Sequence, residues 1–329
     1  MLCVSCLASA GDVVRVGMAW QPNEQAYDRV ARSIELAGGE AVVLPQMRPG
    51  GLDYDSTALN GKCLDKDGVL LQQYADVVKR DTYHGSAIDS LMRGIDAVVF
   101  LGGDDISPTL FREPQPWHGL AGDDCDATRD VSEYLTMAYC LDHDIPVLGL
   151  CRGMQMLAVV SGAAMIQDLD TYYSEQGIDY NNLHRSVRDE NGKRHYTPHD
   201  VLVTDRASLL YGIALSDTIK NVPSWHHQVV GSVEDTELKV TGITPSQGID
   251  IIEAIELKDK TFALGVQYHP EEAVRQHIYN VPTATSFMQL YEGVSYFRAL
   301  IKEVRGKREE GREWRDCSAF THATVILKR

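Results

Sequence analysis

The sequence lacks the features of a membrane protein and of a nucleic-acid-binding protein. No apolar run approaches the roughly 20 residues that a membrane-spanning helix needs. Basic residues are outnumbered, with 31 Lys and Arg against 47 Asp and Glu, and the formal net charge is -16. Nucleic acid and anionic membranes should repel such an acidic chain, which has no large basic patch. We therefore expect neither of them as a partner.

Cysteine pairs and targeting signals are also missing. The seven cysteines are scattered and odd in number, and only Cys3 and Cys6 lie close together. No second Cys or His pair follows them at the spacing of a zinc site. The N-terminus MLCVSCLASAGD has no basic stretch before its apolar residues, so a secretory signal peptide is not expected. These absences predict reduced thiols in a cytoplasmic protein.

The histidines form no metal-binding motif in the sequence. His184, His195 and His199 lie in a polar stretch rich in Tyr, Asn and His, and their intervals do not match the usual spacing of metal ligands. We therefore predict neither a metal site nor a cofactor.

The first half of the chain alternates between strand-like and helix-like segments. Val13–Ala19 and Ala41–Pro45 have the pattern of buried strands, and the helical spacing of Glu24–Ala37 between them ends at a Gly-Gly pair. This order indicates a parallel sheet with crossover helices. Two more strands are predicted, over Asp96–Asp105 and Ile145–Leu150. Further helices are predicted over Ala87–Arg93, Asp126–His143, Arg152–Ser161 and Ala284–Val304.

After Asp168 the pattern changes to short β-like segments. These segments are Val201–Thr204, Gln228–Val233, Glu237–Gly242, Ile249–Leu257 and Phe262–Gln267. We expect them to extend the sheet with antiparallel strands. The predicted fold is α/β, with a mostly parallel central sheet flanked by helices and an antiparallel β extension. No repeat or long linker divides the chain, so we predict one domain over residues 1–304 and a charged tail over 305–329.

A cysteine at a turn between a strand and a helix is the main candidate for catalysis. The strand Ile145–Leu150 leads directly into Cys151, which Gly149 and Gly153 flank, and a helix begins at Arg152. This is the pattern of a nucleophile elbow, in which a strained turn leaves no room for neighbouring side chains. The positive end of the helix favours the thiolate, which is the reactive form of cysteine.

A thiolate nucleophile needs a base, and the base needs a group that orients it. The segment FALGVQYHPEE ends a predicted strand and carries His269 and Glu271 two residues apart. Pro270 restricts the backbone between them, so both side chains can project from one turn. We predict a catalytic triad of Cys151, His269 and Glu271.

These motifs resemble those of the class I glutamine amidotransferase superfamily, and more narrowly its gamma-glutamyl-gamma-aminobutyrate hydrolase family. LGLCRGMQML and GVQYHPEE carry the superfamily resemblance. The narrower one rests on three further segments, FLGGDDISPTLF, RDVSE and SWHHQVV. The resemblance runs in order from about residue 13 to about residue 304. It implies a flavodoxin-like fold, a cytoplasmic enzyme of polyamine catabolism, a small gamma-glutamyl substrate and a homodimer.

The resemblance also implies a reaction. Cys151 would attack the gamma-carbonyl of a gamma-glutamyl amide and form a gamma-glutamyl thioester, which water then hydrolyses. His269 would take the thiol proton and deliver it to the leaving amine. The backbone N–H groups of Arg152 and Gly103 would form the oxyanion hole, and Gly102 would let the main chain approach the substrate.

Other residues are weaker candidates. By resemblance, Gln155 would contact the glutamyl group, and His227 and Gln228 would line the substrate pocket. Arg129, Asp130 and Glu133 are interpreted as a salt network that caps a helix. Ala163 replaces a glycine that is usual after the elbow helix, and residues 50–90 have no counterpart that we can assign.

Several functions stay open at this point. The first is a stand-alone gamma-glutamyl hydrolase, and the alternative is a glutaminase subunit that supplies ammonia to a separate synthetase. A hydrolase of folyl-polyglutamate is disfavoured because no secretion signal is evident. A non-catalytic binding protein on the same scaffold is disfavoured because Cys151, His269 and Glu271 are all present.

Overall fold

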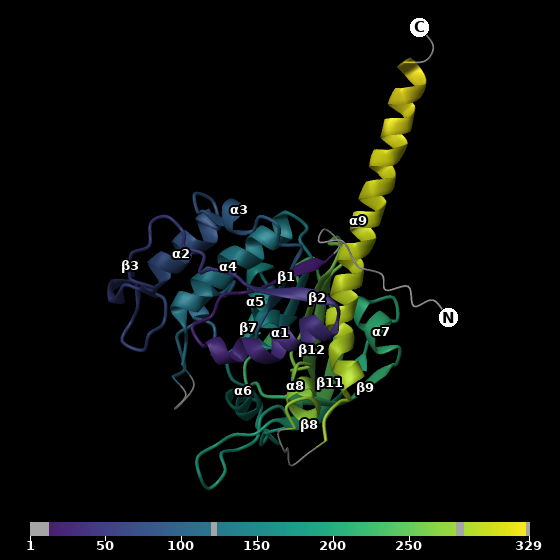
Figure 1. Ribbon diagram of the computed structural model, residues 1–329. Helices are drawn as coiled ribbons and strands as arrows, with labels where there is room; N and C mark the ends of the chain where they lie inside the picture. The colour runs from purple at the N-terminus through teal and green to yellow at the C-terminus, as the bar shows by residue number, and fades with distance from the viewer. Residues whose placement is uncertain (1–12, 120–123, 281–285, 327–329) are drawn as a thin grey trace.

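The computed structural model describes residues 13–119, 124–280 and 286–326, with side chains as far as Glu309 (Figure 1). The expectations for Cys3, Cys6 and the N-terminal segment lie outside the described residues. The cysteines with described side chains are all free thiols: Cys63, Cys125, Cys140 and Cys151.

A nine-stranded sheet forms the centre of the molecule, in the order β2-β1-β5-β6-β13-β12-β11-β8-β9. Its strands are β1 (Val14–Met18), β2 (Gly39–Val43), β5 (Ala97–Phe100), β6 (Val147–Leu150), β8 (Thr197–Val203), β9 (Thr218–Ser224), β11 (Leu238–Ser246), β12 (Ile249–Leu257) and β13 (Ala263–Val266). Neighbours from β2 to β13 are parallel, and neighbours from β13 to β9 are antiparallel. The predicted fold class is therefore confirmed.

Two segments expected in the antiparallel extension lie elsewhere. The segment Phe262–Gln267 contains β13, which runs parallel to β6 inside the central sheet. All four residues of β13 are buried, as is usual for a strand covered on both faces. The segment Gln228–Val233 contains β10 (Val229–Ser232), which pairs with β7 (Ala164–Ile166) in a separate two-stranded sheet. Short apolar runs do not reveal their partners, because the partners are set by tertiary packing.

Helices cover both faces of the sheet (Figure 1). The helices are α1 (Tyr27–Leu36), α2 (Gln72–Asp81), α3 (Ile88–Leu91), α4 (Ala127–Asp142), α5 (Arg152–Val160), α6 (Leu169–Glu175), α7 (Leu209–Ala214), α8 (Glu272–His277) and α9 (Leu290–Ile326). Strand residues alternate between two cores. Along β5, Val98 and Phe100 join the core under α4 and α5, whereas Ala97 and Val99 join the core under α1 and α9.

The region from residue 50 to 90 and the C-terminal end differ from expectation. The helix expected near Ala87–Arg93 is the short α3, and the longer α2 precedes it without having been predicted. Short strands β3 (Tyr54–Asp55) and β4 (Ala58–Leu59) and 3-10 helices over Glu24–Ala26, Gly61–Cys63 and Pro108–Leu110 complete the described elements.

The last helix does not end at Val304 as expected. α9 continues to Ile326, and its final turns project from the body of the molecule (Figure 1). Its middle part is anchored by ion pairs from Lys307 to Asp144 at 2.5 Å and from Arg308 to Asp96 at 2.6 Å. The charged sequence after Val304 is rich in Lys, Arg and Glu, which favour helix even where apolar periodicity is weak.

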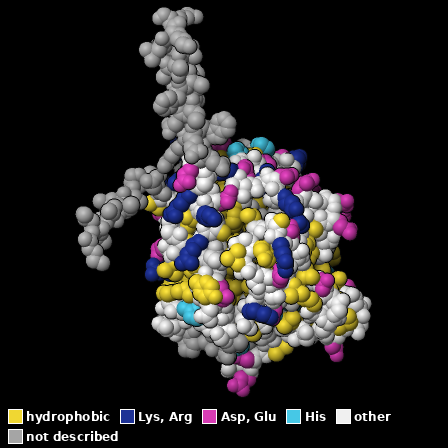
Figure 2. Space-filling view, turned by 90° about the vertical axis from the view of Figure 1, so that its right-hand side faces the viewer, with side chains coloured by type: hydrophobic (Ala, Val, Ile, Leu, Met, Phe, Trp, Pro, Cys, Tyr) yellow, Lys and Arg dark blue, Asp and Glu magenta, His cyan; other side chains and the backbone are white. Residues whose placement is uncertain are grey.

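The surface agrees with the chain's mixed composition. On the face shown in Figure 2, basic side chains lie among acidic and hydrophobic ones. Across the part of the chain that the structure describes, no helix is both long and apolar enough to cross a membrane.

Candidate active site

Cys151 occupies a strained turn between β6 and α5. Its backbone has φ 49° and ψ -105°, a conformation that residues other than glycine rarely adopt. A Cβ atom on Gly149 would lie 2.6 Å from the Gly153 carbonyl carbon, and one on Gly153 would clash with the Phe100 carbonyl oxygen. Both flanking glycines are therefore required by close backbone packing, as the elbow pattern predicts.

The Cys151 side chain lies at the start of α5 and is almost fully buried. Cys151 is the N-cap residue of α5, so its sulfur lies at the positive end of the helix. The Gln267 amide donates to Sγ at 3.5 Å, and Sγ lies 3.8 Å from the Trp225 carbonyl oxygen. The helix end and the Gln267 donor both stabilise negative charge on the sulfur.

His269 and Glu271 form a buried pair beside the cysteine. The His269 Nδ1 lies 2.7 Å from Glu271 Oε1, so the carboxylate orients the ring. Burial by itself lowers the pKa of His269, but the neighbouring Tyr196, Glu271 and Cys151 together raise it well above its ordinary value. Burial raises the pKa of Glu271, and the contact with His269 outweighs this effect and lowers it.

Gly102 lies close to both the histidine and the cysteine. A Cβ atom at Gly102 would lie 2.5 Å from His269 Cε1 and 3.5 Å from Cys151 Cβ. The backbone after β5 therefore lies against both catalytic candidates. Only a glycine allows this approach without moving the imidazole. Gly102 and Gly103 both line the pocket that contains Cys151.

The Gly102-Gly103 turn is fixed by a buried arginine. Arg129 donates to the carbonyl oxygens of Leu101 at 2.9 Å and Gly102 at 3.0 Å. A side chain on Gly103 would clash with the Arg129 guanidinium. Arg129 thus holds the backbone whose N–H groups were predicted to bind the oxyanion.

Arg129, Asp130 and Glu133 do not cap α4 but form a buried ion-pair network. The cap is Asp126, whose carboxylate accepts from the Arg129 N–H at 3.0 Å. Glu133 pairs with Arg129 and also with Arg152. The predicted salt network is therefore confirmed, but its role as a helix cap was wrong. Side chains from α4 and α5 meet between the helices, where a sequence pattern within α4 alone cannot place Arg152.

The predicted substrate-binding residues lie near the cysteine but make protein contacts. Gln155 donates to the Gln228 carbonyl oxygen at 2.9 Å. His227 lies between Asp105 at 3.0 Å and Asp168 at 3.1 Å. Burial lowers the pKa of His227, but the two carboxylates raise it to about 9, so the ring is held as a cation.

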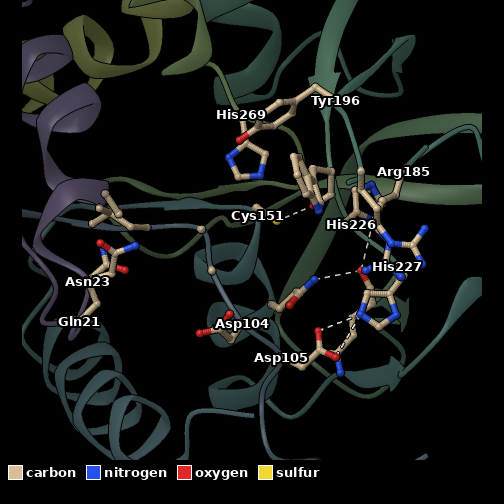
Figure 3. Close-up of a pocket in the computed structure, with 18 of the residues that line it drawn as sticks. Gln21, Asn23, Asp104, Asp105, Cys151, Arg185, Tyr196, His226, His227 and His269 are labelled. Atoms are coloured by element: carbon tan, nitrogen blue, oxygen red, sulfur yellow. Dashed lines mark hydrogen bonds and ion pairs between the residues drawn. The ribbon is translucent and has the colours of Figure 1, made fainter. Parts of the chain in front are cut away.

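These residues line a pocket of about 650 Å³ (Figure 3). It contains the predicted Gly102, Gly103, Cys151, Gln155, His227, Gln228, His269 and Glu271. The sequence analysis missed several of its other residues, among them Asp105, Tyr196 and Trp225. Tyr196 packs edge-on against His269, with ring centroids 5.2 Å apart. Asp105 and Trp225 belong to the quoted GGDDISP and SWHHQ motifs, so these motifs could have identified them. Tyr196 lies in a loop without a recognisable sequence pattern.

The predicted histidines are divided between two places. His195 is exposed and pairs with Asp189 at 3.0 Å. His184 and His199 instead meet His226 and Glu253 in a buried cluster, which has the residue types to hold a metal.

Comparison with known proteins identifies the family. The sequence matches the Peptidase C26 family over residues 77–271. It is 36% identical over 180 residues to Protein NtpR of Enterococcus hirae, covering 54% of this chain and 67% of that protein. It is 32% identical over 242 residues to a Mycobacterium tuberculosis protein whose name describes a candidate glutamine amidotransferase, covering 73% of this chain and 60% of that protein.

Two further similarities bear on the branch and on the fold. The chain is 27% identical over 189 residues to gamma-glutamyl-gamma-aminobutyrate hydrolase PuuD of Escherichia coli (strain K12), covering 56% of this chain and 68% of that protein. A crystal structure of a Thermoplasma acidophilum protein, named for one component of GMP synthase, matches with a TM-score of 0.51 at 16% identity, over 91% of this chain and 98% of that one. The chain belongs to the Peptidase C26 family and has the class I glutamine amidotransferase fold.

Proposed function

We propose that this protein is a cysteine hydrolase that cleaves a gamma-glutamyl amide and releases glutamate and an amine. One observation carries the proposal: Cys151 lies on a strained turn, and the backbone of Gly102 packs closely against both Cys151 and the ring of His269. The pocket thus holds a candidate nucleophile, a candidate base oriented by a carboxylate, and Gly103 of the predicted oxyanion hole. Similarity to family members with glutamine amidotransferase and gamma-glutamyl hydrolase names supports the same reaction class.

The roles of the residues follow from acyl-transfer chemistry. The Cys151 thiolate attacks the gamma-carbonyl carbon, and the carbonyl oxygen becomes an oxyanion near the N–H groups of Gly103 and Arg152. When the intermediate collapses, the C–N bond breaks and the protonated His269 gives its proton to the leaving amine. Neutral His269 then takes a proton from water, which attacks the thioester. The C–S bond breaks, and glutamate leaves as the thiolate is restored.

The electrostatics of the site support this sequence of steps. The raised pKa of His269 means that the imidazole readily holds the proton taken from Cys151. Glu271 is held as a carboxylate, because contact with His269 lowers its pKa against the effect of burial. A thiolate–imidazolium pair is the reactive state of such a site.

The pocket also favours a particular class of amine. Six Arg and Lys residues line it, although the chain as a whole is strongly acidic, and four of them are close together in the sequence: Arg185, Arg188, Lys193 and Arg194. All four come from the loop before β8, on the side of the pocket that carries Tyr196. We propose that they attract a carboxylate on the leaving amine. Gamma-glutamyl-gamma-aminobutyrate has such a carboxylate, whereas glutamine and gamma-glutamyl alkylamines lack it.

A substrate panel tests both parts of the proposal. Glutamate release would be measured from gamma-glutamyl-gamma-aminobutyrate, from gamma-glutamylbutylamine, which has no carboxylate on the amine, and from glutamine. Cys151→Ala should abolish release, and Cys140→Ala, a buried thiol on α4, should retain it. We expect the carboxylate-bearing amide to have the highest kcat/KM.

Two results would count against the proposal. Equal kcat/KM for the two gamma-glutamyl amines would contradict the role of the basic side chains. Release from glutamine alone, rising on addition of a synthetase partner, would favour the glutaminase alternative.

A further inference from the structure

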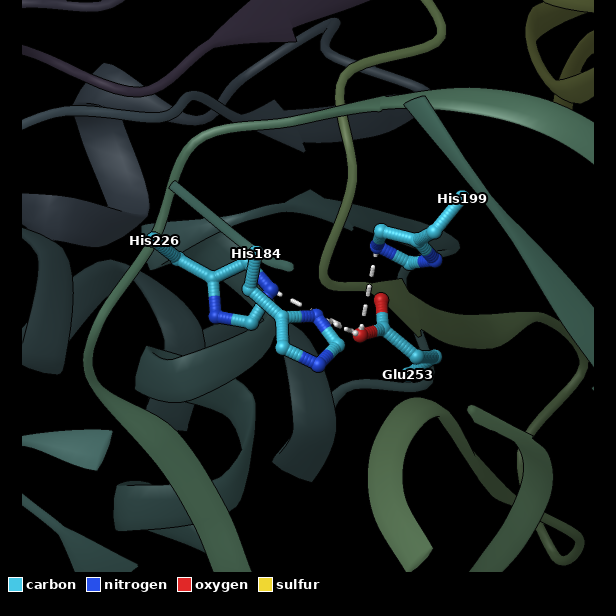
Figure 4. A group of neighbouring side chains, drawn as sticks. All are labelled: His184, His199, His226 and Glu253. Carbon is cyan, nitrogen blue, oxygen red and sulfur yellow. Dashed lines mark ion pairs between the residues drawn. The ribbon is translucent and has the colours of Figure 1, made fainter. Parts of the chain in front are cut away.

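Three histidines and a glutamate from four separate segments meet inside the protein (Figure 4). Glu253 lies on β12 and His199 on β8. His184 belongs to the loop between α6 and β8, and His226 to the turn after β9. The ligand-type atoms of all four side chains lie within 4.8 Å of one another. The cluster is independent of the triad, which uses none of these residues.

The distances within the cluster match those between ligands of one metal ion. Glu253 Oε1 lies 3.0 Å from His184 Nδ1, 3.5 Å from His226 Nε2 and 3.6 Å from His199 Nε2. With zinc–nitrogen and zinc–oxygen bonds of about 2.0–2.1 Å, two ligand atoms of a tetrahedral site are separated by about 3.3 Å. The three observed separations lie on both sides of that value.

Neighbouring groups orient two of the rings toward this point. The His226 Nδ1 lies 3.2 Å from the Gln228 carbonyl oxygen, so Nδ1 carries the proton and Nε2 presents its lone pair to the cluster. The His199 Nδ1 lies 3.2 Å from the Thr244 hydroxyl and 3.4 Å from the Asp200 carbonyl oxygen. Metal-binding histidines typically use one ring nitrogen for the metal and the other for such a partner.

No described residue outside the cluster provides a hydrogen-bond partner for the histidine nitrogens and carboxylate oxygens that face its centre. His184 and Glu253 are fully buried, and His226 and His199 are only 4% and 6% exposed. Apart from their contacts with one another, the two Glu253 oxygens and the three facing nitrogens have no hydrogen-bond partner among the described residues. No lysine or arginine of the described chain pairs with Glu253 either. A buried carboxylate is unfavourable unless a cation compensates its charge.

We propose that His184, His199, His226 and Glu253 bind one zinc ion in a closed tetrahedral site. Three imidazole nitrogens and one carboxylate oxygen are donors that zinc accepts readily. With four protein ligands in an enclosed space, the site has no open position for water or substrate. Its role is therefore structural, and the sequence missed it because its ligands come from separate segments.

The site would fix one wall of the catalytic pocket. His226 and its neighbours Trp225 and His227 all line that pocket. The His184 carbonyl oxygen accepts from the His226 N–H at 3.0 Å and from the Ser224 hydroxyl at 2.9 Å. The zinc ion would join these two loops to β8 and β12, and so hold the pocket wall on the rigid sheet.

Metal analysis of the full chain tests the proposal. The protein would be purified without a metal-affinity tag, stripped with a chelator, exchanged into metal-free buffer, and titrated with zinc or cobalt. We expect about one zinc per chain, and for cobalt the intense visible absorption of a tetrahedral site. We also expect the stripped protein to melt at least about 5 °C below the zinc-loaded protein.

Variants separate this site from adventitious binding. Glu253→Gln and His199→Asn should lose the stoichiometric zinc and the cobalt absorption, whereas His195→Asn, at an exposed histidine, should retain both. A wild-type chain that binds no zinc after titration, or that gives an octahedral cobalt spectrum, would overturn the proposal. So would retention of the tetrahedral spectrum in the Glu253→Gln and His199→Asn proteins. The wild-type measurements decide the matter even if the variants do not fold.

Discussion

Arg152 and Asp130 form an ion pair at 2.5 Å in which neither side chain is exposed to solvent. Arg152 directly follows Cys151, and Asp130 lies on α4, the helix packed against α5. Asp130 also accepts from the Ser107 N–H at 2.9 Å, in the loop that follows the Gly102-Gly103 turn. The pair therefore links the turn at Cys151 to the neighbouring helix and to the loop after the Gly102-Gly103 turn.

Removing Asp130 should destabilise the protein strongly. In Asp130→Ala the Arg152 guanidinium loses a partner in a site without water access, and breaking such a pair typically costs about 3–5 kcal/mol of unfolding free energy. Urea denaturation of the variant and the wild type measures this difference. The control is Asp217→Ala, which breaks an exposed pair with Arg206 and should change little. Equal effects of the two substitutions would refute the structural role of the buried pair.

A methyl group at Gly102 should disturb catalysis more than folding. The added Cβ would lie 2.5 Å from His269 Cε1, so the imidazole must shift away from Cys151. A displacement of about 1 Å between reacting groups can lower the rate about 100-fold, and we expect a loss of that order in kcat for Gly102→Ala. Gly212→Ala is the control, because its Cβ would meet no atom within 4 Å in α7. Wild-type kcat in Gly102→Ala would contradict the placement of His269.

Four of the five parallel strands and the elbow could be predicted from the sequence, but the order of the strands in the sheet was not predicted. The parallel strands are apolar runs followed by helices, and Gly149 and Gly153 mark the turn around Cys151 because backbone atoms fill the space of their missing side chains. Local signals of this kind report local geometry. The contact between His269 and Glu271, the other two members of the predicted triad, was also predictable because only one residue separates them in the sequence.

What could not be predicted depends on contacts between distant segments. The partners of β10 and β13 are chosen by packing, since both are short apolar runs that fit several neighbours. The enclosed group around Glu253 draws residues from four segments spread over about 70 positions, and no interval in the sequence links them. Arg152 was predicted for its backbone N–H, but its buried ion pair with Asp130 requires knowledge of how α4 packs on α5.

The basic loop before β8 should select the substrate's carboxylate. Lys193→Gln and Arg188→Gln each remove a positive charge from the pocket lining. We expect each substitution to raise KM for gamma-glutamyl-gamma-aminobutyrate about 2–5-fold, the size expected for a partly solvated charge contact. KM for gamma-glutamylbutylamine should not change. Lys66→Gln, at an exposed lysine paired with Asp67 outside the pocket, is the control. A parallel rise in KM for both substrates would argue against carboxylate recognition.

The His269–Glu271 pair should make the stability of the protein fall both at low pH and at high pH. Burial opposes the charged forms of both residues. The groups around His269 nevertheless hold its pKa well above the ordinary 6.5, and contact with His269 holds the pKa of Glu271 below the ordinary 4.5. The contribution of His269 is complete below about pH 6.5 and is lost as pH rises through its folded-state pKa. The contribution of Glu271 is complete above about pH 4.5 and is lost as pH falls through its folded-state pKa.

The pair should therefore stabilise the protein most between about pH 4.5 and pH 6.5. We expect the difference in unfolding free energy between the wild type and His269→Asn to be largest in this window and to shrink on either side. Urea denaturation at intervals from pH 4 to pH 9 measures the difference. His195→Asn serves as the control, because that ring is exposed and pairs only with Asp189 among the described side chains. A difference for His269→Asn that stays constant up to pH 9 would mean that His269 is not charged in the folded protein, and the thiolate–imidazolium state of the site would have to be abandoned.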